Sequence, residues 1–339
     1  MSLEIPNRCA SRVFFGLAFQ VDAAILLMLR HICELQGIRL EGKREDIELT
    51  LANDKKIYAQ AKAVVKANND FRSVRRNLCK SLKTLAEAAK NSTEKDARYI
   101  YVTNSPNPLK EETLMRLIKD ETLLPFDSLP AESQNTLLQL MLRPEYQVPL
   151  DRFSIYYFPY VTDDDKEREK IVRNEVEKFV NKISEYAKAG MGEDLLKRWQ
   201  KELFDSAMIY NKGVIVSKKD VIWPLIMILT QFPDSDMYED IEEEILDVIE
   251  QIYSETLNQC VERWEFITQI LYDYNTFTYK GPPRTRHIAF SQQKWPDYID
   301  RFKPIIKDNE ICEAFTKVVL MNVLRRRRAI TSIKQKLHI

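Results

Sequence analysis

The chain has 339 residues, enough for two domains of ordinary size, and its 45% hydrophobic content allows each domain to bury a core. Its 51 basic and 51 acidic residues cancel, so any nucleic-acid-binding surface has to be a local patch. The seven glycines form neither a GxGxxG nor a GxxxxGK[ST] motif, so the fingerprints of dinucleotide and P-loop nucleotide binding are missing.

Cysteine and histidine usage argues against a disulfide framework and a zinc site. The five cysteines are scattered without a CxxC pair, and the chain has three histidines. The N-terminus lacks a secretory pattern, and the apolar run 23–29 is too short to span a bilayer. We therefore expect a cytoplasmic protein that is not inserted in a membrane.

The first third of the chain mixes helical and strand patterns. Apolar residues recur at helical spacing over 16–36, and Gly37 is placed to end that helix. A second helix, with Asp70 as N-cap, is expected over 71–90. Between the two helices, alternating polarity and turn residues predict three strands, at 38–41, 46–51 and 56–63.

The rest of the chain divides at a charged run, residues 163–165. Before it we expect a strand at 99–103, helices at 114–124 and 137–142, and a strand at 153–161 that Pro159 places at a sheet edge. After it we expect helices at 166–188, 193–209, 219–232, 241–275 and 309–336, with a break allowed in the fourth. This predicts an α/β domain over 1–165, a small mixed sheet flanked by helices, followed by an all-α domain over 166–339.

The segment 46–63 carries the residues with the clearest chemistry. Asp46 and Glu48 share one face of their strand, and Gln60 and Lys62 share one face of the next. If residue 52 pairs with 56, Glu48 lies opposite Gln60 and Asp46 opposite Lys62, about 5 Å apart between Cβ atoms. Carboxylate and amide oxygens beside an ammonium group suit phosphodiester cleavage, which needs a cation, an activated water and a positive group for the developing charge.

Each residue then has an expected role. Asp46 and the Gln60 amide oxygen would bind the metal ion, and the carbonyl of Ala61 could join them. Lys62 would orient or deprotonate the attacking water, or stabilise the pentavalent phosphate. Glu48 or Glu41 could hold a second ion. The alternative is that these charges are simply a solvated hairpin face.

These residues resemble the restriction-endonuclease-like PD-(D/E)xK superfamily, over roughly residues 10–165. The resemblance is closer to the N-terminal double-stranded-DNA endonuclease domain of bacterial anti-phage effectors of the CBASS and Lamassu types. It rests on four matched groups: Gly16 and Gln20; Glu41, Gly42 and Glu45 to Glu48; Tyr58, Gln60 and Lys62; Thr103, Asn104 and Ser105. Glu48 departs from the family's frequent Asp, and Gln60 from the superfamily's more frequent acid.

The resemblance implies an endonuclease that hydrolyses double-stranded DNA with Mg²⁺, or with Mn²⁺, as the effector of an anti-phage defence system. It implies that the helical domain controls activity by docking onto an ATPase or sensor subunit, SMC-like or HerA-like, and that the active form is a homo-oligomer. Gln20 would reach the metal site, with a buried amide bonded to the backbone as the alternative. The competing hypotheses are a non-catalytic helical adaptor and a DNA-binding subunit with a degenerate nuclease core.

Two basic segments are candidates for contacting DNA or a partner. The first includes Lys66 and one side of the expected 71–90 helix, with Arg72, Arg75, Arg76 and Lys80. Because it follows the hairpin, phosphate contacts there would position a duplex at the site, although a solvated helix face is the alternative. The second is Arg325 to Arg328, for which a protein or internal partner is favoured over DNA because no base-reading motif accompanies it.

Overall fold

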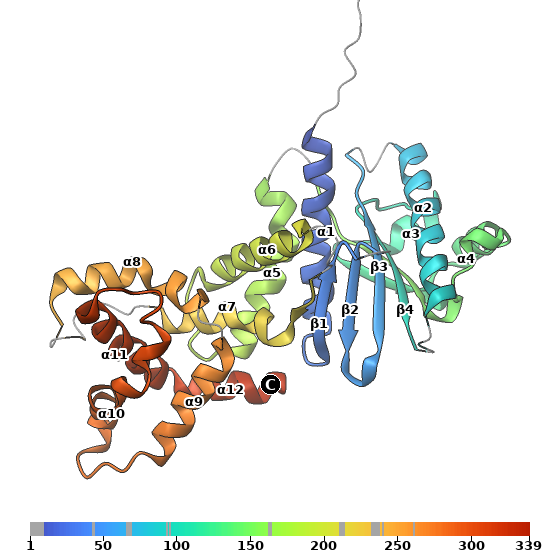
Figure 1. Cartoon of the computed structure of the whole chain (residues 1–339). Helices are drawn as coiled ribbons and strands as arrows, with labels where there is room; N and C mark the ends of the chain where they lie inside the picture. The colour runs from blue at the N-terminus through green and yellow to red at the C-terminus, as the bar shows by residue number, and fades with distance from the viewer. Residues whose placement is uncertain are drawn as a thin grey trace, which may run out of the picture. The chain divides into compact units, whose positions relative to one another are not determined.

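The computed structural model describes residues 10–42, 45–65, 70–92, 94, 96–161, 165–209, 214–231, 238, 241–259 and 262–339. The chain divides into two compact units (Figure 1), one formed by 1–179 with 192–218 and the other by 180–191 with 219–339. This division differs from the predicted boundary after residue 165, because most of the next two helices groups with the sheet. Residues 162–164, which include part of the predicted charged break, lie outside the described residues.

The first unit contains a seven-stranded mixed sheet with the order β5-β6-β4-β3-β2-β1-β7. The pairs β3–β4 and β4–β6 are parallel, and the other neighbours are antiparallel. Its strands are β1 Leu35–Leu40, β2 Ile47–Leu51, β3 Lys56–Lys62, β4 Arg98–Thr103, β5 Thr122–Pro125, β6 Phe153–Tyr157 and β7 Val216–Ser217. Its helices are α1 Ala10–Arg30, α2 Phe71–Asn91, α3 Glu112–Leu117, α4 Ala131–Met141, α5 Asp165–Ile183 and α6 Met191–Met208.

The two long N-terminal helices pack on the centre of this sheet (Figure 1). Helix α1 contacts β1, β2 and β3, where the alternating small and aliphatic residues of β2 and β3, such as Ile47, Ala59 and Ala61, are buried. Helix α2 contacts β3 and β4, and its leucines join a buried cluster that includes Tyr99 and Tyr101. The two-residue alternation of the central strands therefore supports a helix-packed core, as the sequence predicts.

Helix α1 contains a long apolar segment. Its segment Val13–Arg30 is long and apolar enough to cross a membrane, longer than the run 23–29 suggests. However, 61% of that segment is buried within the fold, and Phe19 stacks on Phe158 at 4.7 Å between ring centroids. Most of the apolar surface of α1 is thus used in the core of the first unit, whereas Val13 and Phe14 at its start are exposed.

The helix predicted over 16–36 ends earlier than expected. Helix α1 stops at Arg30, and Gly37 lies inside strand β1 instead of capping a helix. A Cβ atom at position 37 would lie 2.7 Å from the Ile215 side chain, so the close approach of the β7 segment explains the glycine. Position 37 therefore requires glycine because β1 and the β7 segment pack closely there. This close packing is a property of the tertiary fold and cannot be seen in the local sequence.

Two other predictions in the first unit are wrong. The segment predicted as one helix over 114–124 forms α3 and then β5, an antiparallel partner of β6. Strand β6 is not at an edge, because β4 and β5 pair with its two sides, and Pro159 lies beyond its last residue. Short apolar runs with leucine fit either helix or strand, so local pattern could not separate them.

The largely helical C-terminal half is confirmed. Its helices are α7 Lys218–Thr230, α8 Glu243–Gln259, α9 Arg263–Thr276, α10 Arg286–Lys294, α11 Asn309–Arg325 and α12 Arg327–Leu337. The helix predicted over 241–275 is broken into α8 and α9, and the one over 309–336 is broken at Arg326. Inside this unit the buried Asn322 amide donates to the Thr230 carbonyl and is bonded to Tyr253, which ties α11 to α7 and α8.

Candidate active site

Asp46 and Lys62 meet at one end of the central strands. Asp46 lies directly before β2, and its Oδ2 accepts hydrogen bonds from Lys62 Nζ at 2.7 Å and from the Ala61 backbone N–H at 3.0 Å. The Asp46 side chain is 10% exposed and that of Lys62 is 30% exposed. The pair therefore has a buried, fixed carboxylate and an ammonium group that can still reach solvent.

The predicted strand register is wrong by two residues, although the predicted faces are right. Ile47 pairs with Ala59 and Glu48 with Tyr58, because the hairpin turn is Ala52–Asp54 and Leu51 bonds to the Lys55 carbonyl. Continuing this register places Asp46 beside Gln60. A slip of two residues preserves the alternation of faces, so Asp46, Gln60 and Lys62 still share one side of the sheet.

Glu41 and Gln20 extend this group. The Glu41 N–H donates to the Asp46 carbonyl at 2.9 Å, so the end of β1 lies beside the start of β2. Partial burial, and then the negative charge of Asp46, raise the pKa of the Glu41 carboxyl, while Lys62 and a hydrogen bond from the Gln20 side chain lower it. Gln20 is buried on α1, so the structure brings four side chains together: Gln20, Glu41, Asp46 and Lys62. The strand register places the buried residue Gln60 beside Asp46.

The donor set of this group fits a hard divalent cation. Within the described residues, no three His, Cys, Asp or Glu side chains are grouped closely enough to hold a metal ion by themselves. A cation would therefore need the Gln60 amide oxygen or the Ala61 carbonyl besides the Asp46 and Glu41 carboxylates. In an extended strand the N–H and carbonyl of one residue face the same neighbour, so the Ala61 carbonyl faces the side of Asp46. All of these donors are oxygens, as Mg²⁺ prefers.

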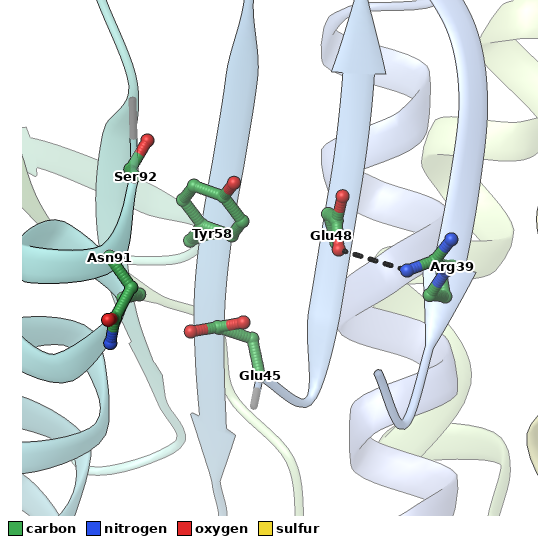
Figure 2. A pocket seen from close by; sticks show the side chains of 7 residues that line it. Arg39, Glu45, Glu48, Tyr58, Asn91 and Ser92 are labelled. Atoms are coloured by element: carbon green, nitrogen blue, oxygen red, sulfur yellow. Dashed lines mark ion pairs between the residues drawn. The ribbon is translucent and has the colours of Figure 1, made fainter. Parts of the chain in front are cut away.

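Glu48 belongs to a different polar pocket, shown in Figure 2. Its carboxylate lies 3.0 Å from Lys56 Nζ and 3.6 Å from an Arg39 guanidinium nitrogen, and the second of these ion pairs is drawn in Figure 2. The pocket has a volume of about 200 Å³ and is lined by Arg39, Glu45, Glu48, Tyr58, Ala88, Asn91 and Ser92. The structure thus does not bring Glu48 to the Asp46 group.

The same pocket raises the pKa of the Tyr58 hydroxyl to about 12, first through burial and then through the charges of Glu94 and Glu48. The Tyr58 ring stacks on the Tyr99 ring, with 6.0 Å between the ring centroids. Tyr58 therefore stays protonated at neutral pH, and its ring connects the hairpin to the α2 side of the sheet.

Asn104 clamps three chain segments behind the site. Its Oδ1 accepts from the Val64 N–H at 2.8 Å, and its Nδ2 donates to the Val64 and Tyr160 carbonyls at 3.0 Å each. The residue is 3% exposed. It follows β4 and holds the chain just after Lys62, which gives the Thr103 to Ser105 segment a structural role beside the candidate site.

We expect Asn104→Ala to lower the free energy of unfolding by roughly 2–4 kcal/mol, because it leaves buried backbone groups unpaired. The Asn91→Ala variant is the control, because its exposed amide donates to the Glu87 carbonyl within the same helix α2. Urea unfolding of both variants measures the difference. Equal free energies of unfolding for the Asn104→Ala and Asn91→Ala variants would contradict the structural role of Asn104.

Sequence inspection missed Asp22, an acid within the apolar part of α1. It is 1% exposed, and its Oδ1 accepts from Gln200 Nε2 of α6 at 2.8 Å. Burial, reinforced by the charge of Glu169, raises the pKa of the Asp22 carboxyl to about 7, against the opposing effects of Gln200, Tyr160 and Arg168. An acidic residue between Val21 and Ala23 was the available signal in the sequence.

This raised pKa makes the stability of the protein depend on pH. The unfolded state releases the Asp22 proton near pH 4 and the folded state near pH 7, so Asp22 lowers stability progressively as pH rises across that window. We expect Asp22→Asn to remove this effect. Its stability relative to the wild type should rise by roughly 2–3 kcal/mol between pH 5 and pH 8. Urea unfolding at both pH values checks this, and a pH-independent difference would contradict the assignment.

The basic face of α2 is exposed and lies beyond the end of β3. Arg72, Arg75, Arg76 and Lys80 are all exposed, at spacings that place them along one side of the helix. The helix begins at the N-cap Asp70, which accepts from the Ser73 N–H, and Asn77 contacts the Ala63 carbonyl at 3.5 Å. The N-terminal half of α2 therefore stands next to the segment that follows Lys62. Lys66 lies outside the described residues.

The arginine run 325–328 is largely turned towards its own unit. Arg327 lies 5.5 Å over the Tyr274 ring and donates to the Leu324 carbonyl, and Arg326 lies 5.5 Å over Tyr186. These contacts with aromatic rings and backbone support the internal-partner hypothesis.

No protein-family model, curated protein or solved structure matches this chain.

Proposed function

We propose that the first unit is the nuclease domain of a metal-dependent endonuclease that hydrolyses phosphodiester bonds of double-stranded DNA. The observation that carries the proposal is the meeting of Asp46, Lys62, Glu41 and the buried Gln60 at the ends of three adjacent strands. The element order, a helix, three antiparallel strands, a helix and a strand parallel to β3, supports a restriction-endonuclease-like core.

Asp46, Glu41, the Gln60 amide oxygen and the Ala61 carbonyl would hold the cation, Mg²⁺ with Mn²⁺ as an alternative. When bound, such a cation polarises the scissile phosphate and makes a bound water more acidic. The Ala61 N–H keeps the Asp46 carboxylate in one orientation, and Gln20 orients Glu41 through its side-chain amide. Gln60 stands where the superfamily more often has an acid, which lowers the negative charge of the site, so a bound DNA phosphate should strengthen cation binding further.

Lys62 supplies the positive charge that the transition state requires. Its ammonium group is part-exposed, so it can contact a phosphate oxygen or hold the attacking water while its backbone stays fixed in β3. Negative charge builds on the phosphate oxygens during attack, and a preplaced cationic donor stabilises that charge more than it stabilises the ground state.

The basic face of α2 would position the duplex by phosphate contacts. We expect the double variant Arg75→Ala/Arg76→Ala to bind duplex DNA roughly tenfold more weakly near 0.1 M salt, and to reduce the slope of log affinity against log salt by about 2. Fluorescence anisotropy without divalent cations measures both quantities.

The matched control removes two basic residues elsewhere in the first unit, Lys55 in the hairpin turn and Lys90 at the other end of α2, both exposed. Its salt dependence should stay that of the wild type. If the two double variants weakened binding equally, net charge would explain the binding and the α2 face would not be a DNA interface.

The wider setting is also part of this proposal. The protein would act in the cytoplasm as the effector of an anti-phage system, with its helical part docked onto an ATPase or sensor subunit and its active form a homo-oligomer. The resemblance of the hairpin to the anti-phage endonuclease domain supports this setting. Analytical ultracentrifugation of the full chain with and without duplex DNA tests the oligomer.

Incubating the purified full chain with supercoiled plasmid and Mg²⁺ or Mn²⁺ tests the activity. We expect open-circular and then linear DNA in the presence of either cation, and none with a chelator. Salt-dependent binding of DNA without nicking under any divalent cation would instead support a DNA-binding subunit with a degenerate nuclease core. If the protein neither binds nor cleaves DNA, the non-catalytic helical adaptor would be supported.

A further inference from the structure

We propose that Lys62 and the divalent cation compete for the Asp46 carboxylate, so that cation binding releases Lys62 from Asp46. This rests on the proposed function, because it concerns the same candidate site. It adds an order of events: without a cation the ammonium group is held by Asp46, and with a cation it becomes available to the substrate phosphate.

The competition follows from the two hydrogen bonds that Asp46 Oδ2 already accepts. A carboxylate has about four lone-pair positions on its two oxygens, and Oδ2 uses both of its own on Ala61 N–H and Lys62 Nζ. A cation that binds this oxygen must therefore displace one donor. The Ala61 N–H cannot leave, because its residue is fixed in β3 between β2 and β4.

The Lys62 side chain is the donor that can leave. It is 30% exposed and has four rotatable methylene groups, so it can swing towards solvent without disturbing the strand. A cation held only on Oδ1 would still lie a few ångströms from the ammonium group, and the repulsion between the two positive charges would favour the same release. Either geometry thus couples cation binding to the position of Lys62.

The released ammonium group stays within the reach of its own side chain. Because its backbone remains beside Gln60 and Ala61, Lys62 would move from the carboxylate to a neighbouring position in which it faces a bound phosphate. The cation would then both bind the phosphate and free the side chain that stabilises the transition state. Cation binding and the Lys62–Asp46 contact would be thermodynamically linked. The contact must therefore weaken cation binding by the same factor by which the cation weakens the contact.

Binding of Mn²⁺ to the full chain, measured by electron paramagnetic resonance and by calorimetry, tests this without any DNA. We expect Lys62→Met to bind Mn²⁺ roughly ten- to hundredfold more tightly than the wild type, because the competing charge-assisted hydrogen bond is gone. The matched control is Lys56→Met, which removes the same charge from the same face of β3 but contacts Glu48 instead of Asp46. Its affinity should stay within about twofold of the wild type.

The outcomes separate this inference from the proposed function. If Asp46→Asn abolishes Mn²⁺ binding but Lys62→Met binds no more tightly than the wild type, the competition is overturned and the cation site stands. A gain in Lys56→Met as large as that in Lys62→Met would also overturn it, because distant charge would then suffice. Mn²⁺ binding that is undetectable, or that ignores Asp46→Asn, would overturn the cation site itself and the competition with it.

A second readout does not depend on affinity. In a crystal structure of the Mn²⁺-bound chain, Lys62 Nζ should lie beyond hydrogen-bonding distance of Asp46 Oδ2, which it contacts at 2.7 Å here. A cation bound to Asp46 with this contact intact would contradict the proposal.

Discussion

The Asp46→Asn variant is expected to lose cation-dependent cleavage of plasmid DNA by roughly a hundred- to thousandfold. Asparagine preserves the size of the side chain and can still accept from the Ala61 N–H, so the local fold should persist. The substitution removes the negative charge that a divalent cation requires. It also removes the charge that attracts the Lys62 ammonium group. The rate of supercoiled DNA loss at saturating Mg²⁺, compared with that of the wild type, gives the effect.

Urea unfolding of the same variant provides the control, because a folded but inactive protein separates chemistry from stability. Raising the Mg²⁺ concentration should restore little activity if Asp46 is a principal ligand. Cleavage by Asp46→Asn at the wild-type rate would show that the carboxylate has no part in the reaction.

Lys62→Met should lose cleavage by a similar factor, roughly a hundred- to thousandfold, for a different reason. Methionine retains the apolar character and most of the length of the lysine side chain but presents no positive charge to the phosphate. The cation site of this variant should remain, and bind more tightly by the competition described above. Activity at saturating Mg²⁺ is therefore the informative measurement, because weak cation binding cannot explain its loss.

Lys56→Met is the matched control for this variant. Lys56 stands on the same strand and face, but its ammonium contacts Glu48 and Thr50. We expect its cleavage rate to stay within about twofold of the wild type. Equal losses in the two lysine variants would point to a general electrostatic effect of the β3 face instead of a specific role for Lys62.

The candidate site could be found from the sequence because strand alternation is local. The side-chain period of two places Asp46, Gln60 and Lys62 on one face in any register that preserves the alternation. The two-residue error in the predicted pairing therefore does not change the face on which these residues lie. The error came from the turn. Asn53 and Asp54 both adopt positive φ angles, and the loop closes one residue earlier than assumed.

Other parts of the site depend on contacts distant in sequence and could not be predicted in the same way. The parity of Glu48 places it on the same face as Asp46, but its pairing with Lys56 and Arg39 requires the true register of all three strands. Asn104 and Asp22 act on segments 40 or more residues away, as in the bonds of Asn104 to Val64 and of Gln200 to Asp22. Such partners are set by the tertiary fold.

The domain boundary shows the same limit. The charged run near residue 163 marks a change from mixed to helical structure, which local composition reveals. It does not reveal that α5 and α6 pack together through Phe179 and Trp199, at 5.7 Å between ring centroids, or that Gln200 bonds to α1. Those contacts assign most of both helices to the sheet unit, and they depend on buried side chains far apart in the chain.

A time course of supercoiled plasmid with Mg²⁺ tests the nuclease site most directly when the wild type is compared with a Lys62→Met variant whose folding and DNA affinity are unchanged. We expect open-circular and linear DNA from the wild type and intact plasmid from the variant over the same period. Equal cleavage by both proteins, or intact plasmid from both with every divalent cation tried, would contradict a nuclease site built on Asp46 and Lys62.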